Sequence, residues 1–241
     1  VTRSNAANSL VAVYNDLDSV ARVFEEHANE LAAVFVEPVA GNMGTIQPDA
    51  GFLEGLRAHC DVSGALLIYD EVMTGFRVAR GGFQDLHGTR CDLITLGKVI
   101  GGGLPAGAEG GRRDRMVQEA PDGAVDPREI LGREGTYEAR EEVGSSLARG
   151  LMEVAARHGR VLSMGRVGSM MCPYFSPVAP RNLSDVTASD REGWTRWFNG
   201  MLERGVLMPP SPYEAFFLSV CHDEEIVQRV LRAADEAFAA L

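Results

Sequence analysis

Apolar residues along the chain alternate between helical spacing and short continuous runs. Apolar positions over 17–31 recur every three or four residues, which predicts an amphipathic helix with a cap at Asn15 and Asp16. The run at 31–38, LAAVFVEP, is continuously apolar and ends in proline, a pattern typical of a strand buried on both faces. A second helix is predicted over 52–64, where Gly64 acts as a stop signal.

Three more runs extend the pattern of the first part of the chain. ALLIYDEV at 65–72 and DLITLGK at 92–98 predict buried strands, and PAGAEGG at 105–111 predicts another. Strands and helices that follow one another in this order imply parallel pairing and an α/β sheet. Residues 118–135 are charged, contain prolines and glycines and show no clear period, which predicts a linker.

The pattern of apolar positions changes in the last hundred residues, where helices surround short strands, and it predicts a small α+β domain. The sequence therefore predicts a large domain over 1–117 and a small domain over 136–241. The elements expected in the small domain are a helix around 143–154, strands near 169–175, a helix at 194–202, a strand pair near 206–210 and 215–220, and a final helix that reaches Leu241.

The composition of the 241-residue chain limits its partners. A formal net charge of −11 argues against a nucleic-acid or anionic membrane surface, and no apolar run reaches membrane-spanning length. The first ten residues lack the apolar core of a secretory signal. Four scattered cysteines and five scattered histidines show no paired spacing, so we expect reduced thiols in a cytoplasmic protein and no metal site.

Two polar residues stand where predicted strands end. Asp70 follows ALLIY and Lys98 follows LITLG, and ligands of parallel α/β sheets bind outside the carboxyl ends of the strands. If these strands are neighbours, a carboxylate and an amine face one crevice, as pyridoxal phosphate requires for its pyridine nitrogen and its Schiff base. Two other interpretations stay open: Lys98 as a solvated loop residue, and Asp70 with Glu71 as the magnesium-binding strand of a nucleotide hydrolase. The hydrolase needs a G-x-x-x-x-G-K-[ST] loop, which the sequence lacks.

Several ordered blocks resemble one enzyme family. VEPVAGNMG at 36–44, GALLIYDEVMTGFRVARGG at 64–82 and DLITLGKVIGGGLPAGAEGGRRDRM at 92–116 are similar to the class III pyridoxal-phosphate aminotransferases. RVGSMM at 166–171 and ERGVLMPPSPYEAFFLSVCHDEEI at 203–226 resemble the C-terminal domain of the aminomutase branch. The resemblance implies a pyridoxal 5'-phosphate cofactor, part of a fold type I large domain like that of aspartate aminotransferase, and a small amino-acid or amino-aldehyde substrate.

The resemblance also implies roles for five residues. Lys98 would form the Schiff base and move a proton between carbons, Asp70 would pair with the pyridine nitrogen, and Val72 would pack against the ring face. Asn42 would hydrogen-bond near the phenolic oxygen of the cofactor, and Glu214 matches an active-site glutamate. Simpler interpretations exist for three of them: Val72 as core, Asn42 as a turn residue and Glu214 as a solvated loop charge. Glu37 and Glu71 are expected to hold backbone and loops rather than to touch substrate.

Two segments of the family pattern have no counterpart. The family carries a longer N-terminal part with a phosphate-binding turn, a ring-stacking aromatic residue and substrate-carboxylate contacts, and none of these is found in residues 1–14. A Q-A-G-T-x-S-G-N-P segment, which contacts cofactor phosphate across the dimer interface, is also missing after residue 111. Both phosphate anchors are therefore expected to be lost. Two hypotheses follow: an enzyme that works as a homodimer or with a homologous chain, and a catalytically impaired remnant or split half that acts as an interaction subunit.

Overall fold

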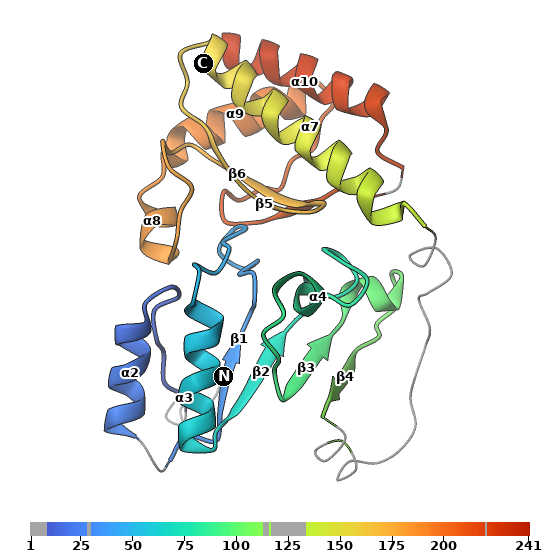
Figure 1. Ribbon diagram of the computed structural model, residues 1–241. Helices are drawn as coiled ribbons and strands as arrows, with labels where there is room; N and C mark the ends of the chain where they lie inside the picture. Colours follow the sequence, from blue (N-terminus) through green and yellow to red (C-terminus); the bar gives the residue numbers. More distant parts are fainter. Residues whose placement is uncertain (1–8, 28–29, 113–115, 117–133, 220) are drawn as a thin grey trace.

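The computed structural model in Figure 1 describes residues 9–27, 30–112, 116, 134–219 and 221–241. A mostly parallel sheet from the first part of the chain lies below an antiparallel sheet from the second part, and each sheet carries helices of its own part. This is the predicted fold class, an α/β part followed by an α+β part. The predicted linker over 118–135 lies almost wholly outside the described residues, so the boundaries 1–117 and 136–241 stay predictions.

The first sheet is built from four short strands: β1 (Ala33–Val36), β2 (Leu66–Asp70), β3 (Leu93–Leu96) and β4 (Ala108–Gly111). The strands β1, β2 and β3 are parallel, whereas β4 runs antiparallel to β3. The connection from β3 to β4 is shorter than the crossover that a parallel pair would need. Asp70 lies opposite Thr95 in the register, so the carboxyl ends of β2 and β3 meet at one rim. This rim faces the second part of the chain (Figure 1).

Helices cover one face of this sheet: α2 (Leu17–Glu26), α3 (Phe52–Ser63) and α4 (Phe83–His87). Leu67 and Tyr69 of β2 are fully buried and share one hydrophobic core with Phe24, Leu56 and Phe83 of these helices. Because side chains alternate along a strand, every second residue of β2 supplies this core.

Two expectations for the first helix and strand are wrong in detail. α2 ends before Leu31, so Leu31 does not belong to the helix as its spacing predicted. Leu31 is apolar because it packs against the core from the segment that leads into β1. The apolar run at 31–38 predicts burial on both faces of β1, but Phe35 keeps 60% of its surface exposed. Val34 and Val36 pack against the core, so the described chain covers only one face of this strand.

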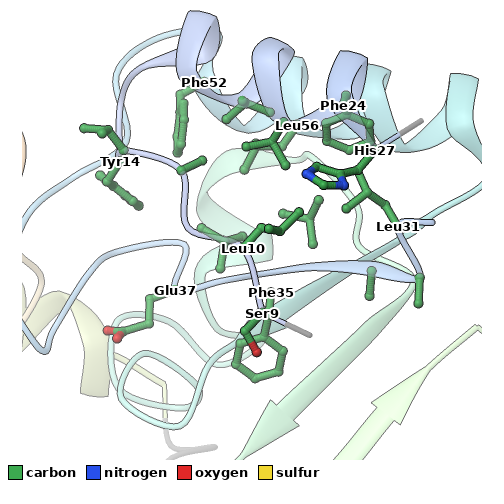
Figure 2. Close-up of a pocket in the computed structure, with 18 of the residues that line it drawn as sticks. Ser9, Leu10, Tyr14, Phe24, His27, Leu31, Phe35, Glu37, Phe52 and Leu56 are labelled. Carbon is green, nitrogen blue, oxygen red and sulfur yellow. The ribbon is translucent and has the colours of Figure 1, made fainter. Parts of the chain in front are cut away.

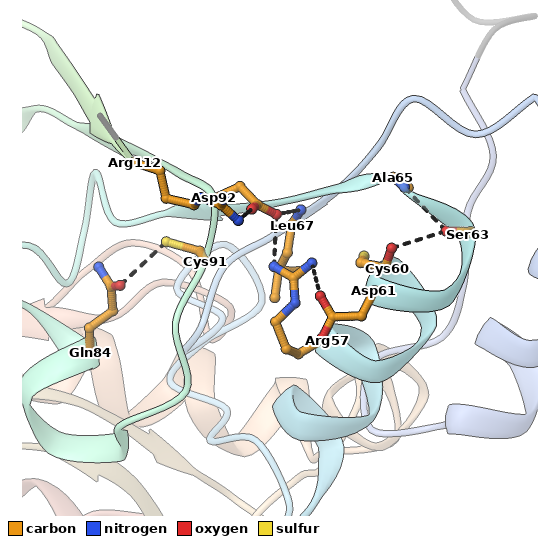
Figure 3. A network of polar contacts seen from close by, with 10 residues as sticks. All are labelled: Arg57, Cys60, Asp61, Ser63, Ala65, Leu67, Gln84, Cys91, Asp92 and Arg112. Atoms are coloured by element: carbon orange, nitrogen blue, oxygen red, sulfur yellow. Dashed lines mark hydrogen bonds and ion pairs between the residues drawn. The ribbon is translucent and has the colours of Figure 1, made fainter. Parts of the chain in front are cut away.

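A polar network fastens the opposite, amino-terminal edge of the sheet (Figure 3). The Asp92 carboxylate, 4% exposed, accepts hydrogen bonds from the Leu67 N–H at 2.9 Å and from Arg57 Nη1 at 2.7 Å. Arg112 Nη1 lies 3.4 Å from the other oxygen of Asp92, and Arg57 also pairs with Asp61 at 2.8 Å. Burial alone would raise the pKa of Asp92, but the Leu67 hydrogen bond and the Arg57 charge outweigh it, so the pKa is lowered. The network ties α3 to β2 and to the start of β3.

The second sheet is antiparallel and consists of β5 (Ser163–Val167), β6 (Met170–Tyr174) and β7 (Phe216–Phe217). A two-residue turn with Gly168 at φ +55° joins β5 to β6 as a hairpin. The strands predicted near 169–175 and 215–220 correspond to β6 and β7. The strand predicted at 206–210 is wrong: no described residue pairs with it, and its two prolines lack the N–H that a ladder needs.

Four helices complete the second part: α7 (Thr136–Arg157), α8 (Leu183–Thr187), α9 (Arg191–Glu203) and α10 (Glu224–Ala239). Trp194 and Trp197 of α9 are buried in one core with Leu151 of α7 and Phe238 of α10. Among the described helices, none is long and apolar enough to cross a bilayer. All four cysteines are free thiols.

Buried contacts hold the two parts against each other. The Thr45 N–H, from the loop after β1, donates to the Tyr174 hydroxyl of β6 at 2.6 Å, and both residues are about 1% exposed. Val167 and Met170, from the β5–β6 hairpin, belong to the hydrophobic core of the first part. The second part is therefore fixed over the rim where β1, β2 and β3 end.

Candidate active site

Asp70 is oriented by its neighbours at the end of β2. Its Oδ1 accepts hydrogen bonds from the Val72 N–H at 3.0 Å and from the Thr95 hydroxyl at 3.4 Å. Both contacts engage the same oxygen, and no described residue donates to Oδ2. The carboxylate is half-buried and fixed by its own loop and by β3, and its second oxygen can accept a hydrogen bond from a ligand N–H.

Lys98 stands two residues beyond β3 and opens the short 3-10 helix η1 (Lys98–Gly101). Its φ of +47° lies in the left-handed region, which residues other than glycine rarely occupy. Residues held there concentrate at functional sites, because the surrounding structure must impose the conformation. The side chain is exposed, and no described residue forms an ion pair or hydrogen bond with its amine. The amine is therefore available to a ligand.

Val72 contacts both Asp70 and the residue that precedes Lys98. Its N–H orients Asp70, and a Cβ added to Gly97 would come within 3.2 Å of its Cγ1, so Val72 packs closely against the residue directly before Lys98. Val72 is half-buried but belongs to none of the hydrophobic cores of the described residues. Its position suits an apolar contact at the rim better than a simple core role.

Asn42 lies in the turn that follows β1, and β1 is the strand that pairs with β2. Its Nδ2 donates to Glu37 Oε1 at 2.6 Å, and the other oxygen of Glu37 accepts the Gly41 N–H. Glu37 directly follows β1 and lies level with Asp70 in the β1–β2 register. Glu37 therefore holds the turn, as expected from the sequence, and Asn42 remains exposed at the same rim.

Glu71 closes the loop that follows Asp70. It is fully buried, and its Oε2 accepts hydrogen bonds from the Phe83 N–H at 2.7 Å and the Thr74 hydroxyl at 2.9 Å. Burial raises the pKa of Glu71, against the opposing effect of these donors. Gly82, at φ +73°, passes so close that a Cβ would collide with the carboxylate. These contacts agree with the expectation that Glu71 holds a loop.

Glu214 reaches the junction from the second part of the chain. It is exposed and lies two residues before β7. Farther along this segment, the Leu218 carbonyl accepts a hydrogen bond from Arg77 Nη1 at 3.1 Å, in the loop that follows β2. The structure therefore brings the Glu214 segment to this loop, but no described contact joins Glu214 to the residues at the strand ends.

The register thus gathers Asp70, Val72 and Lys98 at one rim, with Asn42 at the adjoining strand end. Sequence reasoning missed Thr95, although it supplies the only hydroxyl in the LITL strand. The lysine content of the chain is a stronger sequence signal for the site. Lys98 is the only lysine among the 23 lysine and arginine residues of the chain. The guanidinium of arginine stays protonated in proteins, so arginine cannot replace a lysine whose amine must react with a carbonyl.

Comparison with known proteins defines the class. Residues 3–140, more than half of the chain, match the sequence profile described as Aminotransferase class-III. The chain belongs to the class III aminotransferase family. Among curated relatives, it is 43% identical to the glutamate-1-semialdehyde 2,1-aminomutase 2 of Brevibacillus brevis, over 98% of this chain and 59% of the relative. It is 44% identical to the glutamate-1-semialdehyde 2,1-aminomutase of Desulforudis audaxviator, over 99% of this chain and again 59% of the relative.

Solved structures agree on the fold. The β-phenylalanine aminotransferase of Variovorax paradoxus aligns with a TM-score of 0.78 at 32% identity, over 94% of this chain and 56% of that one. The FumI protein of Sphingopyxis sp. MTA144, solved in its PLP internal aldimine form, aligns with a TM-score of 0.83 at 28% identity, over 100% of this chain and 59% of that one. The fold is therefore part of a fold type I transferase, and pyridoxal 5'-phosphate is the cofactor indicated for the family.

Proposed function

We propose that the chain carries the lysine and carboxylate side of a pyridoxal-phosphate site of the aminotransferase or aminomutase type. Relatives and neighbours with this chemistry support the proposal, as does a rim that offers an amine, an oriented carboxylate and an apolar side chain. The observation that carries it is Lys98, the sole lysine, held at φ +47° three residues beyond Thr95, which is the register partner of Asp70.

Each rim residue has a task that its surroundings suit. Lys98 Nζ offers a primary amine to a carbonyl and can carry a proton between adjacent carbons. Asp70 would accept the N–H of a ring nitrogen and keep it protonated, Val72 would support the ring face, and Asn42 would bind near the phenolic oxygen. Glu214 would contribute a catalytic carboxylate from the second part. When bound, the cofactor supplies an electron sink for charge at the α-carbon of the substrate.

The substrate class follows from the same relatives. A small amino acid or amino aldehyde fits the family, and glutamate-1-semialdehyde is the substrate proposed from the two aminomutases. Its product would be 5-aminolevulinate, a tetrapyrrole precursor. We place this activity in the cytoplasm and in a dimer, or in a pair with a homologous chain.

A second candidate function is that of an interaction subunit. The chain spans 59% of the curated relatives it matches. The Thr95 hydroxyl at the rim donates to Asp70, and the hydroxyl of the buried Thr74 in the loop after β2 donates to Glu71, so neither is left for a phosphate. Charge-assisted hydrogen bonds contribute about 1.5–3 kcal/mol each, so a site without several of them would hold the cofactor weakly. Such a chain would act only together with a partner.

A labelling experiment tests the site. The purified chain is mixed with pyridoxal 5'-phosphate, reduced with borohydride, digested and analysed by mass spectrometry. We expect a stable adduct on the peptide that contains Lys98. The only other primary amine is the N-terminal one, which serves as an internal control for non-specific reaction.

Two variants show whether the adduct depends on the proposed site. Lys98→Arg keeps the charge and removes the primary amine, so it should abolish the adduct while the far-ultraviolet circular dichroism stays unchanged. Asp70→Asn should keep the amine and weaken cofactor retention. Equal labelling of Lys98 and of the N-terminal amine at all cofactor concentrations would contradict the proposed site.

A further inference from the structure

Charge is distributed unevenly over the described chain. The net charge is −11, and a groove of about 920 Å³ under α2 and α3 carries Glu30 and Glu37 but no arginine or lysine among its described lining residues (Figure 2). These carboxylates would repel an anion from the groove. The opposite holds where the loop after β2 meets the start of α7, because positive charge gathers there.

Three arginines lie around Tyr137 at this junction. Arg77 and Arg80 belong to the loop after β2, and Arg140 lies near the start of α7. We call these three residues the arginine cluster. Burial raises the pKa of Tyr137, and the charges of all three arginines oppose that rise, so each of them lies near the phenol. Among the described residues, no carboxylate forms an ion pair with the arginine cluster.

Arg140 turns its guanidinium back onto the first turn of α7. It is 7% exposed, its Nε donates to the Thr136 carbonyl at 3.2 Å, and its Cζ lies 4.5 Å from the centre of the Tyr137 ring. Its Nη2 is buried and has no hydrogen-bond partner among the described residues. A buried charged donor without an acceptor is costly, so an anion at this position would stabilise it.

Arg77 presents a second donor of the same kind. It is half-buried, its Nη1 donates to the Leu218 carbonyl at 3.1 Å, and its Cζ lies 4.9 Å from the centre of the Phe217 ring. Its Nε is buried and finds no acceptor in the described chain. Burial lowers the pKa of Arg77, and the Arg140 charge lowers it further, so the two guanidinium groups repel each other. An anion bound by both would replace this repulsion with two attractions.

The start of α7 adds to the positive potential. α7 is 22 residues long, and its N-cap, Gly135 at φ +79°, has no side chain to cap the first N–H groups. The first turn of a helix carries a partial positive charge and binds anions. Glu138, the acid of this turn, is exposed, and Glu141 is held by Arg166 through both carboxylate oxygens, at 2.5 and 2.8 Å. Neither carboxylate neutralises the arginine cluster through a described contact.

We propose that Arg77, Arg140 and the first turn of α7 bind a phosphate-type dianion, either inorganic phosphate or the phosphate group of a small ligand. Two guanidinium groups match two negative charges, whereas a single carboxylate would leave one of them uncompensated. The exposed Arg80 adds attraction at longer range. The dianion would tie the loop after β2 to α7, beside the hydrogen bond that the Tyr137 hydroxyl donates to the Phe76 carbonyl at 3.1 Å. The site uses none of the residues of the proposed cofactor site.

Thermal unfolding without cofactor tests the inference. Tryptophan fluorescence reports the part of the chain that contains α7, and it is followed in about 10 mM inorganic phosphate and in chloride of equal ionic strength. We expect phosphate to raise the melting temperature by about 2–5 °C, and the rise should saturate. Arg140→Met should abolish the rise, and this variant should fold because it removes a buried charge without a partner. Arg149→Met is the matched control, since it removes the same charge from an exposed side chain of the same helix, and it should keep the full rise.

Three outcomes would overturn the inference. The first is no rise with phosphate, and the second is an equal rise in the wild type and in Arg140→Met, because phosphate would then act on the protein in general. The third is an equal rise with acetate, which would assign the site to carboxylates. Pyridoxal 5'-phosphate added to Lys98→Arg separates the two sources of phosphate: a larger rise than with inorganic phosphate indicates a ligand's phosphate group, and an equal or smaller rise indicates free phosphate. The main comparison contains no cofactor, so its result is independent of the adduct at Lys98, which tests the proposed function.

Discussion

Replacing Asp92 by asparagine should destabilise the first part of the chain, because it removes a buried charge and keeps the shape. Asp92→Asn retains one oxygen that can accept the Leu67 N–H, now 2.9 Å away. That oxygen would also still accept from Arg57 Nη1, now 2.7 Å away on the same carboxylate oxygen, but it would carry no negative charge to pair with the guanidinium. The new amide group would take the place of the other oxygen and face Arg112 Nη1, now 3.4 Å away, so Arg112 would meet a donor instead of a charged acceptor.

The magnitude follows from burial. Hydrogen bonds to charged groups contribute about 1.5–3 kcal/mol, and breaking a fully buried ion pair costs about 3–5 kcal/mol. The side chain of Asp92 is 5% exposed but that of Arg57 is 21% exposed, so water can partly solvate the guanidinium that remains. We therefore expect the free energy of unfolding to fall by about 2–3 kcal/mol, which is 30- to 150-fold in the unfolding equilibrium.

The assay has to report on the first part of the chain, which contains Asp92. Both tryptophans lie in α9, so their fluorescence reports the second part. Amide exchange at Leu67, whose N–H bonds directly to Asp92, reports the network, and far-ultraviolet circular dichroism in urea gives the overall transition. Asp61→Asn is the matched control, because Asp61 also pairs with Arg57 but is 66% exposed, and it should cost less than about 1 kcal/mol.

The pH dependence gives a second check on the same residue. The pKa of Asp92 is lower in the folded chain than its ordinary 3.8, so its stabilising charge is fully present above that value and is lost as the pH falls through the folded pKa. The difference between the wild type and Asp92→Asn should stay constant from about pH 7 to about pH 5 and shrink below about pH 4. Equal losses for Asp92→Asn and Asp61→Asn, or a difference that grows on acidification, would refute the assignment of the network to Asp92.

Two further substitutions probe the junction between the parts and the start of α7. Tyr174→Phe leaves the buried Thr45 N–H without its acceptor at 2.6 Å and should lower the free energy of unfolding by about 1–3 kcal/mol, measured by tryptophan fluorescence in urea. Arg140→Met should raise it by about 1–2 kcal/mol, because Arg140 is 7% exposed and its Nη2 has no hydrogen-bond partner among the described residues. Burial and the Arg140 charge both lower the pKa of Arg77, so Arg140→Met also removes a like-charge repulsion between these two arginines. A lower melting temperature for Arg140→Met would contradict this reasoning.

Continuous apolar runs made the first sheet predictable, whereas the second sheet depended on contacts that the sequence hides. β1, β2 and β3 coincide with such runs, and their parallel order follows from the intervening elements. β5 was missed because SMGRV has no alternation, and it exists through pairing with β6 across the hairpin turn. The run VLMPP looked like a strand by composition, but its prolines cannot donate to a ladder.

The candidate site was predictable where a side chain follows a strand. Asp70 and Lys98 stand directly after apolar runs, and strand register alone brings Asp70 to the end of β3 that leads to Lys98. Their partners were harder to find: the Thr95 hydroxyl orients Asp70 across two strands, and Glu37 holds Asn42 through a turn. Such contacts depend on register and turn geometry, which neither composition nor spacing encodes.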